Sequence, residues 1–185
     1  MTTLEIWNAA LALLPHDRRI ASLDEDSTEA LRCRDNWDAA RRAVLSARDW
    51  NWLSREEPGC CGAFGGWGRP DGALRIVGLV DPSGRRLRCR ASDGMLFPVG
   101  PDAGRAVAVR YVPDCEDPAL WPPSVAEAVA AELAARLAPV LTDNAQRESA
   151  LMALAARRLE DAGEADANET AGDGGDPLAF ARARR

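Results

Sequence analysis

Residues 26–48 read DSTEALRCRDNWDAARRAVLSAR and carry the clearest secondary-structure signal in the chain. Their apolar side chains recur every three or four positions, which places them on one face of an α-helix. Asp26 and Glu29 have the spacing of a capping box, in which side chains bind the first free amide groups of a helix. We therefore expect a helix over these residues, with a buried stripe of Ala30, Cys33, Trp37, Ala40, Val44 and Ala47.

A first helix is expected before this one, over residues 3–14. Thr2 and Glu5 again have the capping-box spacing, and Pro15 ends the pattern because proline has no amide hydrogen to donate.

Two more helices are expected near the end of the chain. Ser124 and Glu127 form a third candidate capping box, and Pro139 is expected to kink or end the helix that follows. Asp143 is expected to cap a fourth helix that fades near Gly163. The apolar stripe predicted on the fourth helix is Met152, Ala155, Ala156 and Leu159.

The segment between residues 49 and 120 has a different character. Helical periodicity disappears, prolines and glycines become frequent, and several stretches alternate with the period of two that is typical of strands. Residues 60–72 contain five glycines and are expected to form a loop. The stretches expected to be extended are 50–53, 74–80, 86–90, 95–97 and 105–112.

Together these patterns predict an α+β protein: an antiparallel helical bundle with an inserted small antiparallel β-sheet and an extended C-terminal tail. The expected divisions are 1–49 for the N-terminal helices of the bundle, 50–120 for the β-rich insertion, 121–163 for the C-terminal helices, and 164–185 for the tail.

Composition limits the classes of function. The 185 residues include 29 acidic and 23 basic side chains, so the formal net charge is −6. A general duplex-DNA binder normally has the opposite balance, because its affinity comes from neutralising phosphates. No apolar run reaches the ~20 residues that a membrane-spanning helix needs, so no membrane association is expected.

Candidate catalytic residues are few. His16 is the only histidine, so any Ser–His–Asp or Cys–His arrangement must use it. The glycine-rich run 62–68 leads toward a predicted strand, whereas a phosphate-binding loop leads into a helix N-terminus. The five cysteines have no zinc-ligand spacing. We therefore expect no enzyme activity, no cofactor and no metal; a small cytosolic enzyme that uses His16 and a thiol stays open as an alternative.

The predicted tail has few residues able to hold it in place. Ordering a residue costs ~1–2 kcal/mol of backbone entropy, whereas burying Leu178 and Phe180 returns only ~1.5–3 kcal/mol each. We expect the tail to be disordered in the isolated chain and to order against a partner. The candidate docking residues are Leu178, Phe180, Arg182, Arg184 and Arg185.

Several short motifs, taken in order, resemble the tail tubular protein A family, the portal–tail adaptors of short-tailed bacteriophages. They begin with the helix start at Ile6–Leu11 and the Ile-Ala-Ser-Leu loop at 20–23. The motifs that follow are Asp24–Ala30, Asp49-Trp-Asn-Trp52, Val109-Arg-Tyr-Val112, Asp117–Trp121 and Leu137-Ala-Pro-Val-Leu-Thr142. The resemblance covers about residues 4–160, and the glycine-rich run 62–72 departs from it.

The resemblance implies a structural protein of the virion, made in the host cytoplasm and located at the head–tail interface. It implies a dodecameric ring that binds the portal protein on one side and a nozzle or tail-tube protein on the other. DNA passes through the lumen of such a ring without sequence-specific binding. A head–tail connector of a long-tailed phage or phage-like particle shares this role and is the second alternative.

Overall fold

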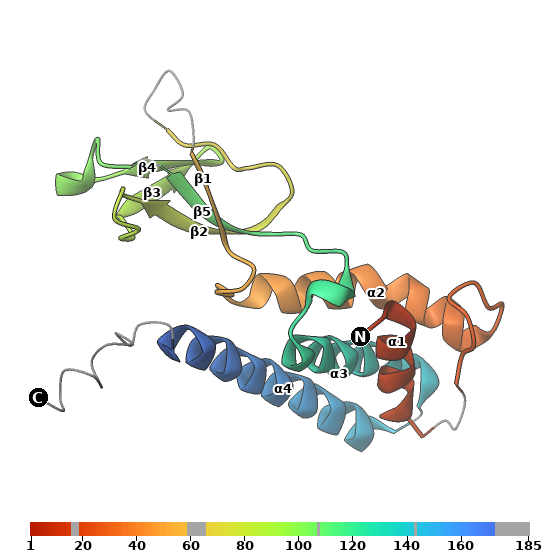
Figure 1. Cartoon of the computed structure of the whole chain (residues 1–185). Helices are drawn as coiled ribbons and strands as arrows, with labels where there is room; N and C mark the ends of the chain where they lie inside the picture. Colours follow the sequence, from red (N-terminus) through yellow and green to blue (C-terminus); the bar gives the residue numbers. More distant parts are fainter. Residues whose placement is uncertain (16–18, 59–65, 107, 143, 173–185) are drawn as a thin grey trace, which may run out of the picture. The chain divides into compact units, whose positions relative to one another are not determined.

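The computed structural model describes residues 1–15, 19–58, 66–106, 108–142 and 144–172 (Figure 1). The described residues form four α-helices and small antiparallel sheets, so the expected mixture of helix and sheet is confirmed. The chain divides into two compact units. Met1–Val44 and Asp117–Arg185 form the first, called the helical unit here, and Leu45–Glu116 form the second, called the strand unit.

The first two helices begin at side-chain caps. In α1 (Thr3–Ala12) the capping box is present, because the hydroxyl of Thr2 accepts from the Glu5 amide at 3.2 Å and the Glu5 carboxylate accepts from the Thr2 amide at 2.7 Å. In α2 (Thr28–Ala47) the hydroxyl of Ser27 accepts from the Ala30 amide at 3.3 Å, so Ser27 rather than Asp26 lies at the cap.

The helix α3 (Pro123–Leu141) is the most buried element of the helical unit. Its alanines allow close approach, and it packs against α1 and α4. The expected capping box at Ser124 is wrong: Pro122 occupies the cap position without a side-chain hydrogen bond. Pro139 does not end the helix, which continues for two more residues.

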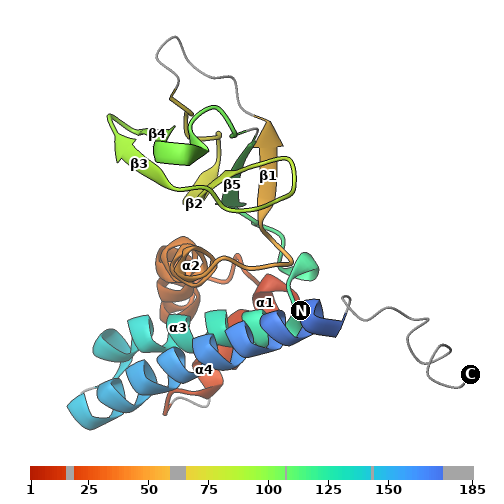
Figure 2. The same cartoon turned by 90° about the vertical axis from the view of Figure 1, so that its left-hand side faces the viewer.

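The helix α4 (Ala145–Gly172) lies alongside α3 in both views (Figures 1 and 2). Its 28 residues correspond to a length of ~42 Å. The helix passes through Gly163, which is buried, so the expected end at this glycine is wrong. Residues 164–172, assigned to the extended tail by the sequence, are helical. Asn144 accepts from the Arg147 amide at 3.1 Å at its start, and the expected cap Asp143 lies outside the described residues.

The strand unit contains two small antiparallel sheets. In the first, β5 (Ala108–Pro113) lies between β1 (Arg55–Pro58) and β2 (Ala73–Val80). In the second, β3 (Cys89–Ser92) pairs with β4 (Met95–Pro98). A core of Trp67, Leu79, Leu87 and Val109 lies in this unit.

Two strand expectations need correction. Trp50 to Leu53 form a turn instead of an extended segment, because the amides of Leu53 and Ser54 donate back to the Trp50 carbonyl. The strand expected at 86–90 begins later, at Cys89, and only an isolated bridge joins Arg86 to Val80.

Candidate functional site

An apolar groove of about 540 Å³ opens on the helical unit. Alanines keep its walls shallow, while Met152 of α4 is 58% exposed beside it. The sequence places Met152 on a buried stripe, whereas in the structure that stripe forms one wall of the groove. Its lining residues are Ala43, Val44, Glu132, Ala135, Arg136, Pro139, Met152, Ala155, Ala156 and Leu159.

The charges of this groove neutralise one another. Arg136 donates from Nε to Glu132 at 2.8 Å, one helical turn away on α3. Pro139 lies one further turn along, and it has no amide hydrogen to donate to the carbonyl of Ala135. The groove therefore presents apolar surface with one internally satisfied ion pair, which suits the packing of a partner side chain.

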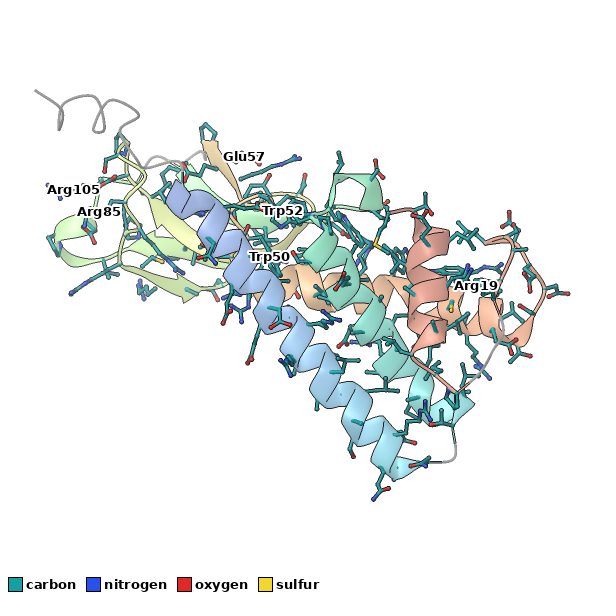
Figure 3. All side chains as sticks on the ribbon, turned by 60° about the horizontal axis from the view of Figure 1, so that its bottom comes forward. Arg19, Trp50, Trp52, Glu57, Arg85 and Arg105 are labelled. Atoms are coloured by element: carbon teal, nitrogen blue, oxygen red, sulfur yellow. The ribbon has the colours of Figure 1, made fainter. Side chains whose placement is uncertain are left out.

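In the strand unit the buried carboxylate of Asp102 lies beside two exposed arginines, Arg85 and Arg105. Arg85 donates from Nη2 to Oδ1 of Asp102 at 3.1 Å, and the backbone amide of Arg88 donates to Oδ2 at 3.0 Å. These bonds, the Arg88 amide first, lower the pKa of Asp102. Arg105 also acts electrostatically on this carboxylate, and Figure 3 shows Arg85 and Arg105 at the same end of the unit.

A second carboxylate, that of Asp81, binds the same guanidinium of Arg85. Asp81 accepts from Arg85 Nε at 3.1 Å and from the hydroxyl of Ser83 at 2.5 Å. The Ser83 hydroxyl is the largest cause that lowers the pKa of Asp81 to about 2, and the two carboxylates in turn raise the pKa of Arg85. Arg85 is therefore held between two ionised groups while half of its side chain stays exposed.

Arg90 of β3 is a further exposed arginine of the strand unit. Its guanidinium lies 5.3 Å from the ring centroid of Phe97, the residue paired with it on β4. We call the exposed residues Arg85, Arg88, Arg90 and Arg105 the arginine patch. The alternating arginines of 86–90 indicate a strand in the sequence, but nothing in the sequence indicates that Asp102 binds the Arg85 side chain and the Arg88 amide.

Three tryptophans pack together in the helical unit. The ring of Trp37 on α2 stacks on Trp121, with centroids 5.9 Å apart, and meets Trp7 of α1 edge-on at 6.2 Å. Trp7 and Trp121 are buried, as a structural role requires. In the strand unit Trp50 is fully buried, and its indole nitrogen donates to the Leu45 carbonyl at 3.0 Å (Figure 3).

The enzyme alternative requires His16 and a reactive cysteine thiol. His16, Cys60 and Cys61 lie outside the described residues. Burial, with a smaller contribution from Glu29, raises the pKa of Cys33 to about 12, so this thiol stays protonated at neutral pH. The side chains of Cys89 and Cys115 are half-buried. In the part of the chain that the structure describes, no three histidine, cysteine or acidic side chains gather as a metal site would need.

The docking residues predicted from the sequence are Leu178, Phe180, Arg182, Arg184 and Arg185, and all five lie outside the described residues. The structure instead describes the helix that precedes them and the groove on the same unit.

Comparison of the sequence with models of known protein families and with curated proteins finds no match to either.

Proposed function

We propose that this chain is a structural subunit of a virion, which assembles with other copies into an adaptor ring between the portal and the tail. Its partners are the portal protein, a downstream nozzle or tail-tube protein, and its own copies, in a ring of twelve. DNA passes through the lumen without sequence-specific contacts. The protein is made in the host cytoplasm and remains at the head–tail interface of the particle.

The observation that carries this proposal is the apolar groove on the helical unit. Met152, Leu159 and Pro139 line a surface that a neighbouring copy covers in the assembled ring. Burying a Met or Leu side chain contributes ~1.5–3 kcal/mol, and many such small contributions are enough for a repeated subunit contact. The motifs that resemble the tail tubular protein A family support the same role.

The proposal includes the arrangement of the helices and of the residues that follow them. We take the helices as an antiparallel bundle, with residues beyond Gly172 as an extended tail that orders on the portal. Among the described residues, no helix combines the length and the apolar character that a membrane span requires.

Electron microscopy tests the proposal in the particle itself. Gold-labelled antibody against this chain is expected at the head–tail junction of a short-tailed particle. Label at the same junction of a long-tailed particle favours the connector alternative, and label absent from purified particles contradicts both.

A substitution tests the tail. The double substitution Leu178→Ala and Phe180→Ala is expected to weaken binding to purified portal rings at least tenfold, because these are the only large apolar side chains beyond Gly172. The matched control is Thr170→Ala with Asn168→Ala. Unchanged portal affinity of the tail variant would remove the docking role of these residues.

A further inference from the structure

Charge is divided unevenly between the two units. Residues 45–116 hold ten arginines and nine carboxylates, whereas the remainder holds 13 arginines and 20 carboxylates. The strand unit thus has net charge +1 and the helical unit −7. A subunit with surfaces of opposite sign attracts other copies of itself in a defined orientation.

The positive charge is concentrated on the arginine patch. Residues 85–105 contain five arginines and two aspartates, so this segment has net charge +3 and the rest of the chain −9. Arg86 is used internally, since its guanidinium donates to the Val77 carbonyl. Arg88 and Arg90 have exposed side chains, and only the Arg88 backbone is bonded to Asp102.

The negative charge is concentrated at the end of α4. From Leu159 to Gly172 the helix has five acidic residues and no basic one. Glu160, Asp161, Glu164 and Glu169 are exposed, and we call them the acidic strip. Of these residues, Glu169 lies in the last turn of α4, where the negative end of the helix dipole adds to the attraction for a cationic partner.

The acidic strip continues from the apolar groove. Ala156, Glu160 and Glu164 follow one another at intervals of four residues, so they lie along one side of α4. Ala156 lines the groove. A partner that covers the groove therefore also meets the acidic strip, and its surface must supply positive charge there.

We infer that the arginine patch of one copy binds the acidic strip of a second copy. This inference rests on the proposed ring and names the two surfaces that join its subunits. The two surfaces differ, so the contact is heterologous. A heterologous contact forms a ring when the rotation between neighbouring copies closes, as the proposed function requires.

Duplex DNA is another polyanion that arginines bind. The charge of the chain makes a second copy the better partner for the arginine patch. Four exposed arginines make few phosphate contacts, while the net charge of −9 on the rest of the chain repels the duplex. The acidic strip offers carboxylates, to which guanidinium groups bind through paired hydrogen bonds.

Charge reversal tests the contact on the full chain. One variant carries Arg88→Glu and Arg90→Glu, and the other carries Glu160→Arg and Glu164→Arg. Self-association is measured by sedimentation over a range of concentrations at ~0.05 M and ~0.5 M salt, because screening weakens contacts between exposed charges. Each variant alone is expected to associate at least tenfold more weakly than the unaltered protein.

The mixture of the two variants is the decisive sample. In it, the reversed patch of one variant faces the reversed strip of the other, and both unaltered surfaces also meet an opposite charge. An equimolar mixture is therefore expected to associate, with the two variants alternating. A mixture that stays monomeric overturns the inference, as does either variant that associates as tightly as the unaltered protein.

A matched control distinguishes the effect of charge at the two proposed surfaces from the effect of the net charge of the whole chain. Arg32→Glu with Arg147→Glu makes the same change in charge at exposed sites of α2 and α4, and association is expected to stay within twofold of the unaltered protein. Loss of association in this control overturns the inference. Loss of duplex-DNA binding in the Arg88/Arg90 variant with unchanged self-association assigns the patch to DNA instead.

Binding to portal rings distinguishes a wrong contact between the arginine patch and the acidic strip from a wrong proposed function. If the contact is wrong but the ring is right, the Arg88/Arg90 variant still assembles on portal rings as the unaltered protein does. If the proposed function is wrong, the unaltered protein does not bind portal rings at all.

Discussion

Arg85 reaches the buried carboxylate of Asp102 with Nη2 at 3.1 Å and the carboxylate of Asp81 with Nε at 3.1 Å. One guanidinium thus ties the turn after β2 to the 3-10 helix Gly100–Asp102. The same bonds determine how the strand unit responds to acid.

We predict that the strand unit loses stability between about pH 4 and pH 2. The folded-state pKa values of Asp102 and Asp81 lie below their unfolded values, so their carboxylates stabilise the fold above the unfolded pKa, and this is lost as the pH falls through the folded pKa. In Asp102→Asn the free energy of unfolding, measured by urea denaturation at several pH values, is expected to depend less on pH over this range. Asp71→Asn is the matched control, and an unaltered acid profile in Asp102→Asn contradicts the role of this carboxylate.

The tryptophan stack predicts a large effect at Trp121. Trp121→Ala removes a buried ring that stacks on Trp37 and is expected to lower the free energy of unfolding by ~3–5 kcal/mol. Trp121→Phe keeps an aromatic ring and loses an indole N–H that has no hydrogen-bond partner among the described residues, so it is expected to lose less than half as much. Urea denaturation measures both, and equal losses would contradict a packing role for the stacked ring.

The backbone of β2 predicts a specific requirement for glycine. Gly78 has φ of +153°, and a Cβ placed there would lie 3.1 Å from Nε of Arg86. Gly78→Ala is expected to lower the free energy of unfolding by ~1–3 kcal/mol, because the backbone is strained and Arg86 must move. Gly68→Ala meets nothing within 4 Å and is the control, with an expected change within ~0.5 kcal/mol in thermal or urea unfolding.

Burial predicts that Cys33 is inert in the folded chain. A thiol with a pKa of about 12 has a thiolate fraction near ~10⁻⁴ at pH 8, whereas an unfolded cysteine near pKa ~8.5 is about a quarter ionised. Alkylation of Cys33 by iodoacetamide, followed by peptide mass mapping, is therefore expected to be over ~10³-fold slower in the folded protein than in urea. Rapid alkylation without unfolding would reopen Cys33 as the thiol of the enzyme alternative.

The sequence predicts the long helices well where caps and periodicity agree. The expected helix over 26–48 and the observed α2 differ by two residues at the start and one at the end. The fourth helix shows the limit of local signals. Gly163 suggests a helix end, yet in the structure it is buried beside the fully buried Ala162, where small side chains allow close packing that no local pattern reveals.

The strands are harder to predict because their order depends on distant partners. The sequence of β1, Arg-Glu-Glu-Pro, has no apolar alternation, and all four residues are exposed. It is a strand only because β5 pairs with it, with Arg55 opposite Tyr111, and its charges and proline suit the edge of a sheet.

The candidate surfaces are also set by tertiary contacts. The arginines of 85–90 are visible in the sequence, but Asp102, which fixes Arg85 and the Arg88 amide, lies 12 to 17 residues later without a motif. Met152 has the periodicity of a core residue, and only the packing of α3 on α4 leaves it at an open groove.

The native mass of the purified protein, measured alone and after mixing with a purified portal ring, tests the central proposal most directly. We predict that many copies bind each portal ring together, so the mixture gains one species whose added mass is a whole number of subunits near twelve. A chain that remains a monomer in both samples contradicts the account.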